Sequence, residues 1–105
     1  ILEQTREKQL PDLILGRWYI ECKRYGSGAE PLEAWWQQVL NATQEKGIPA
    51  LVYKFNRRPI KVRVPLGAIN SQLNIKAPFT ADLLWVDFIF LLKNLYKEDI
   101  DNHDL

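Results

Sequence analysis

The stretch PDLILGRWYIECKRY, residues 11–25, decides the fold because it contains two apolar runs separated by Gly16-Arg17. A glycine at the first central position of a two-residue connection is typical of a tight β-hairpin turn. The simplest register pairs Leu15 with Trp18 across that turn. The segment therefore predicts two short antiparallel strands, which we expect at residues 12–15 and 18–25.

The same register brings three charged side chains together. Asp12 falls directly opposite Glu21, and Lys23 shares the face of Glu21 because side chains alternate between faces along a strand. Cross-strand Cβ atoms lie about 5 Å apart, and two carboxylates this close repel unless a cation binds between them. These three side chains are therefore interpreted either as a divalent metal site or as a surface charge cluster. The opposite, apolar face would hold Leu13, Leu15, Ile20 and Cys22.

Pro11-Asp12 followed by Glu21-Cys22-Lys23 resembles the signature of the PD-(D/E)XK nuclease superfamily. The resemblance covers about residues 4–66, because a helix-like stretch and an apolar, strand-like stretch follow the triad over residues 31–66. This order of elements is similar to that of Holliday junction resolvases and their phage-encoded relatives. The resemblance implies an α/β fold, namely a restriction-endonuclease-like mixed β-sheet flanked by helices.

The resemblance also implies a function, a metal-dependent endodeoxyribonuclease that hydrolyses phosphodiester bonds with Mg²⁺, for which Mn²⁺ can substitute. Asp12, Glu21 and the backbone carbonyl of Cys22 would bind the metal, and Lys23 would act on the attacking water or on the phosphate. Gln38 is the expected polar helix residue beside Lys23, although a solvated helix face explains it equally well. The implied substrate is DNA, including branched DNA, and the implied assembly is a homodimer.

Two alternatives to a junction resolvase stay open. The first alternative is a restriction, repair or DNA-end-processing nuclease. The second is a non-catalytic nucleic-acid-binding module with the same fold. Junction resolvases usually have an acidic residue on a helix ahead of the first strand. Only Glu3 and Glu7 precede Pro11, so we expect that helix to lie upstream of Ile1.

Charge is distributed unevenly, although the formal net charge is only +1. Residues 48–81 contain no Asp or Glu, and this basic region is consistent with binding a polyanion. Ordinary loop chemistry is the alternative for the turn at residues 56–59. The residues expected to contact DNA phosphates are Arg24, Lys54, Arg57, Arg58, Lys61 and Arg63. The acidic residues after Lys97 predict a single domain at 1–97 and an acidic tail at 98–105.

Composition limits the other classes of protein. The 105 residues are enough for one domain, and 47% apolar residues argue against disorder. A single cysteine excludes an intramolecular disulfide and suits a reducing compartment, while one cysteine and one histidine disfavour a zinc site. The apolar run Leu83–Leu92 is too short to span a bilayer. We therefore expect no membrane association and a cytoplasmic location, in the host cytoplasm if a phage encodes the chain.

The remaining elements follow from periodicity. Residues 85–92 offer a candidate dimer surface, formed by Trp85, Phe88, Phe90 and Leu92, or else they belong to the core. The C-terminal part reads as a strand at 83–86 followed by a helix at 88–97, or as a single helix at 80–97. The other expected elements are a strand at 2–8, a helix at 31–47, strands at 51–55 and 60–65, and a loop at 67–80.

Overall fold

The hairpin that the sequence predicts is present in the computed structural model, which describes residues 11–101. Strands β1 (Leu13–Leu15) and β2 (Trp18–Tyr25) pair antiparallel, with Leu15 opposite Trp18 and Leu13 opposite Ile20. The turn needs glycine because Gly16 has a φ of +58°, a conformation that disfavours side chains. The register prediction is confirmed, whereas the strand expected at residues 2–8 lies outside the described residues.

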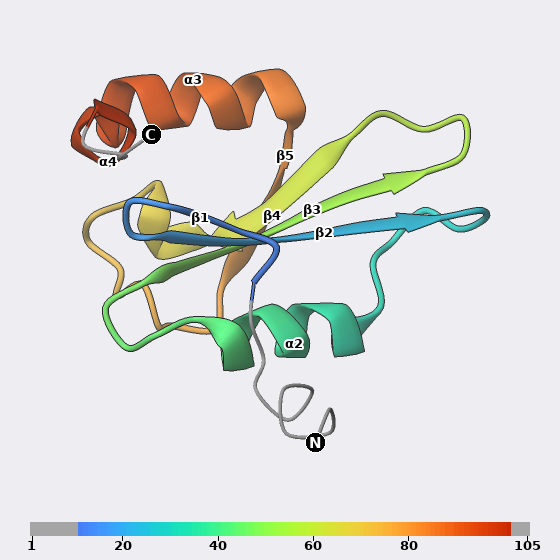
Figure 1. The fold of residues 1–105 in the computed structure, drawn as a ribbon, viewed down its shortest axis with the longest axis horizontal. Coiled ribbons are helices and arrows are strands. Elements are labelled where there is room, and N and C mark those ends of the chain that lie inside the picture. Colours follow the sequence, from blue (N-terminus) through green and yellow to red (C-terminus); the bar gives the residue numbers. More distant parts are fainter. Residues whose placement is uncertain (1–10, 102–105) are drawn as a thin grey trace.

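Within residues 11–101, five strands form one mixed sheet in the sequential order β1-β2-β3-β4-β5. Strands β2 and β3 are parallel, and the crossover between them is helix α2, whereas every other neighbouring pair is antiparallel. Helix α2 covers one face of the sheet, and helices α3 and α4 cover the other (Figure 1). This is the mixed α/β architecture that the sequence predicts. The remaining elements are α2 (Glu33–Ala42), β3 (Ile48–Phe55), β4 (Lys61–Pro65), the 3-10 helix η1 (Leu66–Ala68), β5 (Thr80–Leu84), α3 (Trp85–Leu95) and α4 (Lys97–Asp101).

The two faces of the sheet have different cores. On the α3 face, the fully buried Trp18 meets Phe88 edge to face, with ring centroids 5.3 Å apart. The α2 face has a smaller core of Trp36, Val39, Leu51, Tyr53 and Phe55. Full burial of one such apolar side chain contributes roughly 1.5–3 kcal/mol. The larger α3 core therefore carries most of the apolar stabilisation, and the α2 face has room for polar groups.

Helix α2 is shorter than predicted. It ends at Ala42 because Thr43 is extended, and the Thr43 hydroxyl donates a hydrogen bond of 2.7 Å to the carbonyl of Val39. Gly47 therefore lies beyond the end of the helix and does not cap it. Its role is close packing, since a Cβ at this position would lie 2.6 Å from the ring of Tyr19.

The C-terminal part follows the first of the two predicted alternatives, with shifted boundaries. Residues 80–84 form β5, which pairs with β4, so a single helix over 80–97 is wrong. Phe88 and Leu92 point into the core and are 1% and 4% exposed, which corrects their prediction as dimer-surface residues. Trp85 and Phe90 are exposed, at 44% and 67%.

The acidic C-terminal segment belongs to the fold as far as Asp101. Asp99 is buried, and its Oδ1 accepts hydrogen bonds from the backbone N–H of Arg17 at 2.8 Å and from Nε of Arg17 at 3.0 Å. A third bond, from Nη2 of Arg17 to Oδ2 of Asp99, is 2.9 Å long. The hydrogen bonds from Arg17 hold the pKa of Asp99 below its ordinary value. This pair ties α4 to the hairpin turn, so residues 98–101, predicted to begin the acidic tail, are part of the folded domain.

Candidate active site

The hairpin edge brings Asp12 beside β2. Asp12 immediately precedes β1, and the register of the hairpin places it opposite Glu21. Its Oδ2 accepts a hydrogen bond of 2.8 Å from the backbone N–H of Cys22, in place of the ladder partner that β1 no longer supplies. Within an antiparallel ladder, the N–H and C=O of one residue face the same neighbouring strand. The Cys22 carbonyl therefore faces the edge where the Asp12 carboxylate lies.

Glu21 is the centre of the cluster. Glu21 is only 5% exposed although it is a carboxylate, and its register partner on β3 is the fully buried Leu51. The ammonium group of Lys23 lies 3.7 Å from Oε2 of Glu21. Helix α2 contributes Gln38, whose Nε2 donates a hydrogen bond of 3.3 Å to the same oxygen. The four side chains predicted to be catalytic, Asp12, Glu21, Lys23 and Gln38, are therefore brought together.

The local sequence explains why Gln38 reaches this position. Trp36 and Val39 are buried against the sheet, as their helical spacing predicts. Gln38 lies at the margin of that buried stripe and is partly exposed, so its amide extends over β2 toward Glu21. The alternative of a purely solvated helix face is wrong for Gln38 but fits Gln37, which is exposed and bonds Glu33 within the helix.

The electrostatics of Glu21 are unfavourable in the absence of a cation. Burial raises the pKa of Glu21 above its ordinary value of 4.5, and the neighbouring Asp12 raises it further. Lys23 acts in the opposite direction and lowers that pKa, but it does not outweigh the other two effects. A divalent cation between Asp12 and Glu21 would favour the ionised form of both carboxylates.

The donor set fits magnesium in number and type. Within residues 11–101, no group of three or more His, Cys, Asp or Glu side chains is placed to hold a metal. The cluster offers two carboxylates, from Asp12 and Glu21, together with the carbonyl of Cys22. Mg²⁺ is commonly bound by one or two carboxylates and keeps several water ligands, so this sparse oxygen set suits it. Glu3 and Glu7 lie outside the described residues.

The side chain of Cys22 does not belong to the core. The predicted apolar face of the hairpin holds for Ile20, which is buried, and for Leu15, which packs against the α3 core. Leu13 lies opposite Ile20 and so shares its face, as predicted, but Leu13 is 49% exposed and Cys22 is exposed. The core on the α3 face takes Trp18 and Ile20 from β2 and does not extend along the strand to Cys22.

Most of the predicted DNA-contacting residues gather where β2 and β3 end. Arg57 and Arg58 are exposed on the turn between β3 and β4. Arg24 donates from Nη2 to Oδ1 of Asn56 at 3.3 Å, and Lys54 donates from Nζ to the carbonyl of Phe55 at 2.9 Å. Lys61 begins β4 beside the same turn. DNA contact by these five residues stays a prediction.

Arg63 differs from the other basic residues because its charge has an internal partner. It donates from Nε to Oδ1 of Asp82 at 2.8 Å and from Nη2 to Oδ2 at 3.1 Å. The hydroxyl of Tyr53 donates to the same Asp82 carboxylate. The charge of Arg63 is therefore partnered within the fold, and its contact with DNA stays a prediction. Sequence analysis missed Asp82 and Tyr53, because the pairing of β4 with β5 becomes apparent only when residues 80–84 are taken as a strand.

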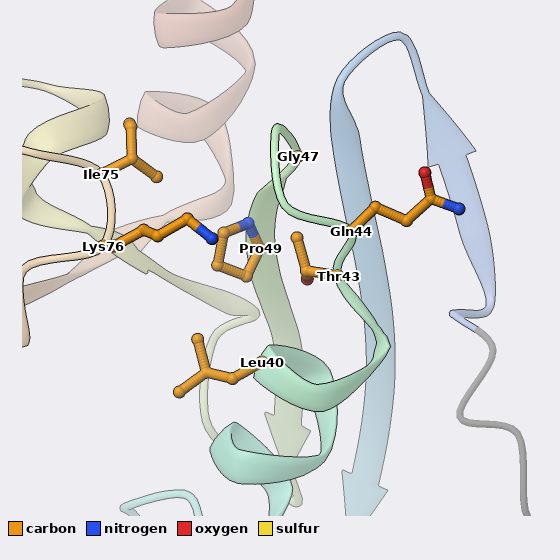
Figure 2. Close-up of a pocket in the computed structure, with 7 residues that line it drawn as sticks. All are labelled: Leu40, Thr43, Gln44, Gly47, Pro49, Ile75 and Lys76. Atoms are coloured by element: carbon orange, nitrogen blue, oxygen red, sulfur yellow. The ribbon is translucent and has the colours of Figure 1, made fainter.

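A pocket of about 220 Å³ lies at the C-terminal end of α2, away from the charged cluster. Lys76 is its one charged lining residue, and its side chain extends toward Pro49 (Figure 2). None of the four predicted catalytic residues lines this pocket, so it is separate from the candidate site. The lining residues are Leu40, Thr43, Gln44, Gly47, Pro49, Ile75 and Lys76.

Comparison of the chain with protein-family models, with curated proteins and with solved structures gives no match. The resemblance to PD-(D/E)XK nucleases therefore rests on the residues of the hairpin and on the order of the elements. Among residues 11–101, no helix has the length and apolar character needed to cross a membrane.

Proposed function

We propose that the chain is a Mg²⁺-dependent DNA endonuclease that resembles a Holliday junction resolvase. The observation that carries the proposal is that Asp12, just ahead of β1, Lys23 on β2 and Gln38 on α2 converge on the buried carboxylate of Glu21. Opposed carboxylates with an adjacent ammonium group match the needs of phosphodiester hydrolysis, which requires a metal, an activated water and stabilisation of negative charge.

Each residue has a role that its position permits. Asp12 and Glu21, with the carbonyl of Cys22, would hold Mg²⁺, which when bound polarises the phosphate and lowers the pKa of water. Lys23 places a positive charge 3.7 Å from Glu21 and so stands where it orients the attacking water or neutralises charge on the phosphate. Gln38 donates to Glu21 and thereby fixes the direction in which that carboxylate points.

The proposed substrate is DNA, including branched DNA, and the proposed assembly is a homodimer in the cytoplasm. Two symmetric cuts in a four-way junction match the symmetry of a two-fold dimer. Trp85 and Phe90 remain the candidate dimer-surface residues, because both are exposed on α3. The basic residues at the ends of β2 and β3 would contact the phosphate backbone, which supplies affinity without sequence choice.

The test is cleavage of a labelled synthetic four-way junction in Mg²⁺ and in EDTA, beside linear duplex and single-stranded DNA. We expect paired, symmetric nicks in the junction that require the metal. Lys23→Ala should abolish cleavage and leave DNA binding intact, whereas the exposed Lys93→Ala, on the opposite face, should retain both. Full activity of Lys23→Ala would contradict the assignment of the site.

The same assay separates the alternative functions. Metal-dependent cleavage of the linear controls would indicate a restriction, repair or end-processing nuclease that uses the same four residues. Tight binding without cleavage would indicate a non-catalytic nucleic-acid-binding module.

A further inference from the structure

Three aromatic side chains form a shelf at the end of β2, which we call the aromatic shelf: Tyr25, Trp35 and Phe55. The Trp35 ring stacks on Phe55, with centroids 6.0 Å apart and planes inclined at 26°. The Tyr25 centroid lies 5.8 Å from that of Trp35 and 6.4 Å from that of Phe55. Phe55 is buried, Trp35 is partly buried, and Tyr25 is 56% exposed. The shelf therefore has a buried floor and an open aromatic edge.

The aromatic shelf and the candidate active site share the same two elements. Glu21, Lys23 and Tyr25 are alternate residues of β2, so all three face α2. Two residues of a strand span about 6.6 Å, which places the backbone of Tyr25 roughly that far beyond Lys23. On α2, Trp35 and Gln38 are three residues apart and lie on neighbouring parts of one helix face. A nucleic acid strand across Glu21 and Lys23 would continue over the shelf.

Positive charge lies beside the aromatic shelf. A cleft of about 120 Å³ adjoins Phe55, and Arg58 and Lys61 are the basic residues in its lining. The backbone N–H of Arg58 donates to the carbonyl of Phe55 at 3.0 Å, which fixes Arg58 next to the shelf. Glu30 is the carboxylate in the same lining; it is highly exposed and lies 3.9 Å from Arg63. A phosphate group would therefore find two cations here.

The loop that follows β2 leaves Tyr25 as the accessible ring. Gly28, with a φ of +124°, approaches Phe55 so closely that a Cβ would lie 2.9 Å from its ring. Phe55 is thus covered by this loop and by Trp35, whereas more than half of Tyr25 is open to solvent. A purely structural aromatic cluster would not require its outermost ring to be this exposed.

We propose that the aromatic shelf binds an unpaired nucleobase, which stacks on Tyr25 at the edge next to Trp35, while Arg58 and Lys61 contact the adjoining phosphate. Stacking on aromatic side chains beside a basic groove is how proteins hold single-stranded nucleic acid with little sequence preference. A base inside a continuous duplex has both faces covered by its neighbours, so the shelf selects DNA with an unstacked nucleotide. This inference rests on the proposed nuclease function. It restricts the substrate to DNA that has a single-stranded or branched position close to the cut.

The test is the affinity of the full chain for a fluorescent oligothymidine of about 10 nucleotides, a length within the usual site size. The affinity for a duplex of the same length is measured for comparison, and EDTA is present in both measurements to prevent cleavage. Tyr25→Ala should weaken binding of the single strand by about 5- to 150-fold, the range for loss of one stacked base, with a smaller effect on the duplex. Tyr25→Phe should bind as the wild type does. The control Phe79→Ala removes a ring that is 57% exposed and does not belong to the shelf, and it should change neither affinity.

A second measurement does not depend on Tyr25. Oligothymidine should quench tryptophan emission of the wild type, and Trp35→Phe should lose most of that quenching. The proposal that the shelf binds a nucleobase would be refuted if Tyr25→Ala kept its single-strand affinity or lost equal affinity for single strand and duplex. The absence of quenching would refute it as well. Junction cleavage by the same proteins separates this result from the nuclease proposal. An active wild type with unchanged Tyr25→Ala affinity refutes the shelf alone, and an inactive wild type with the expected affinity loss refutes the nuclease alone.

Discussion

Replacing Glu21 with Gln removes a buried negative charge at nearly constant side-chain size, and we expect it to stabilise the metal-free protein at pH 7. The attraction between Glu21 and Lys23, at 3.7 Å, is worth about 4 kcal/mol at an effective dielectric constant near 20. Burial and the charge of Asp12 outweigh it, because the pKa of Glu21 is raised and not lowered. The expected increase in the free energy of unfolding is a small difference between large terms. We expect about 0.5–2 kcal/mol, the usual size of a single stabilising substitution.

The pH dependence of this gain identifies its cause. A carboxyl group whose pKa is raised in the folded state destabilises that state as the pH rises above its unfolded value, here 4.5. The stability advantage of Glu21→Gln should therefore be absent below pH 4.5 and should grow as the pH rises through the pKa of folded Glu21. Thermal unfolding measures it, since each kcal/mol shifts the Tm of a domain of this size by about 4–8 °C.

Magnesium should reverse the order of stability. At a hundred times its Kd, a ligand that binds only the folded state contributes about 2.7 kcal/mol. This exceeds the gain expected for Glu21→Gln, and we expect the wild type to receive it and Glu21→Gln not to. Glu45→Gln removes one exposed carboxylate and is the control for net charge. This account of Glu21 would be refuted if Glu21→Gln were less stable than the wild type in EDTA at pH 7. It would also be refuted if the stability gain of Glu21→Gln did not vary with pH.

Three further predictions concern the fold and the assembly. Gly16→Ala should destabilise the protein by more than the roughly 1–2 kcal/mol that a left-handed alanine costs, because its Cβ would lie 2.5 Å from Cβ of Asp99. Gly26→Ala is the control, since the nearest atom to its Cβ would be 3.8 Å away. Chemical unfolding should show a far smaller loss of stability for Gly26→Ala than for Gly16→Ala. Asp99→Asn should cost about 2 kcal/mol at pH 7 through its hydrogen bonds to Arg17. Since the pKa of Asp99 is lowered from 3.8, that cost should diminish as the pH falls below 3.8, and a constant cost would argue against the ion pair. Phe90→Glu should halve the mass measured by light scattering if α3 forms the dimer contact, and an unchanged dimer would exclude that surface.

The hairpin was predictable because local rules determine it. Glycine between two apolar runs fixes the turn, and the turn fixes the register. That register alone places Asp12 opposite Glu21 and Lys23 on the same face. The extent of α2 was less predictable, because Thr43 leaves the helix and Gly47 serves contact with Tyr19, and neither effect appears in helical periodicity.

Contacts between distant segments explain most of the errors. The Arg17–Asp99 pair joins residues 82 positions apart, so the acidic C-terminal residues read as a tail. Asp82 was not recognised as the partner of Arg63 because the strand that carries it was ambiguous with a helix. Cys22 has the strand parity of a core residue, but parity specifies only a face and cannot say how far along the strand a covering helix extends.

Glu21 and Tyr25 depart from what stability alone would favour on the same face of β2. A buried position in a sheet is best filled by an apolar side chain, yet Glu21 is a carboxylate with a raised pKa and with Asp12 opposite. Tyr25 exposes a large ring at the end of the strand, where a smaller polar residue would suffice. Local departures of this kind are expected at functional sites, because residues there are chosen for a ligand and the rest of the fold compensates. Here the compensation comes from the opposite face, where Trp18 and Phe88 are buried completely or nearly so. The polar and exposed residues on the α2 face and the apolar core on the α3 face therefore support the proposal that DNA binds on the α2 face.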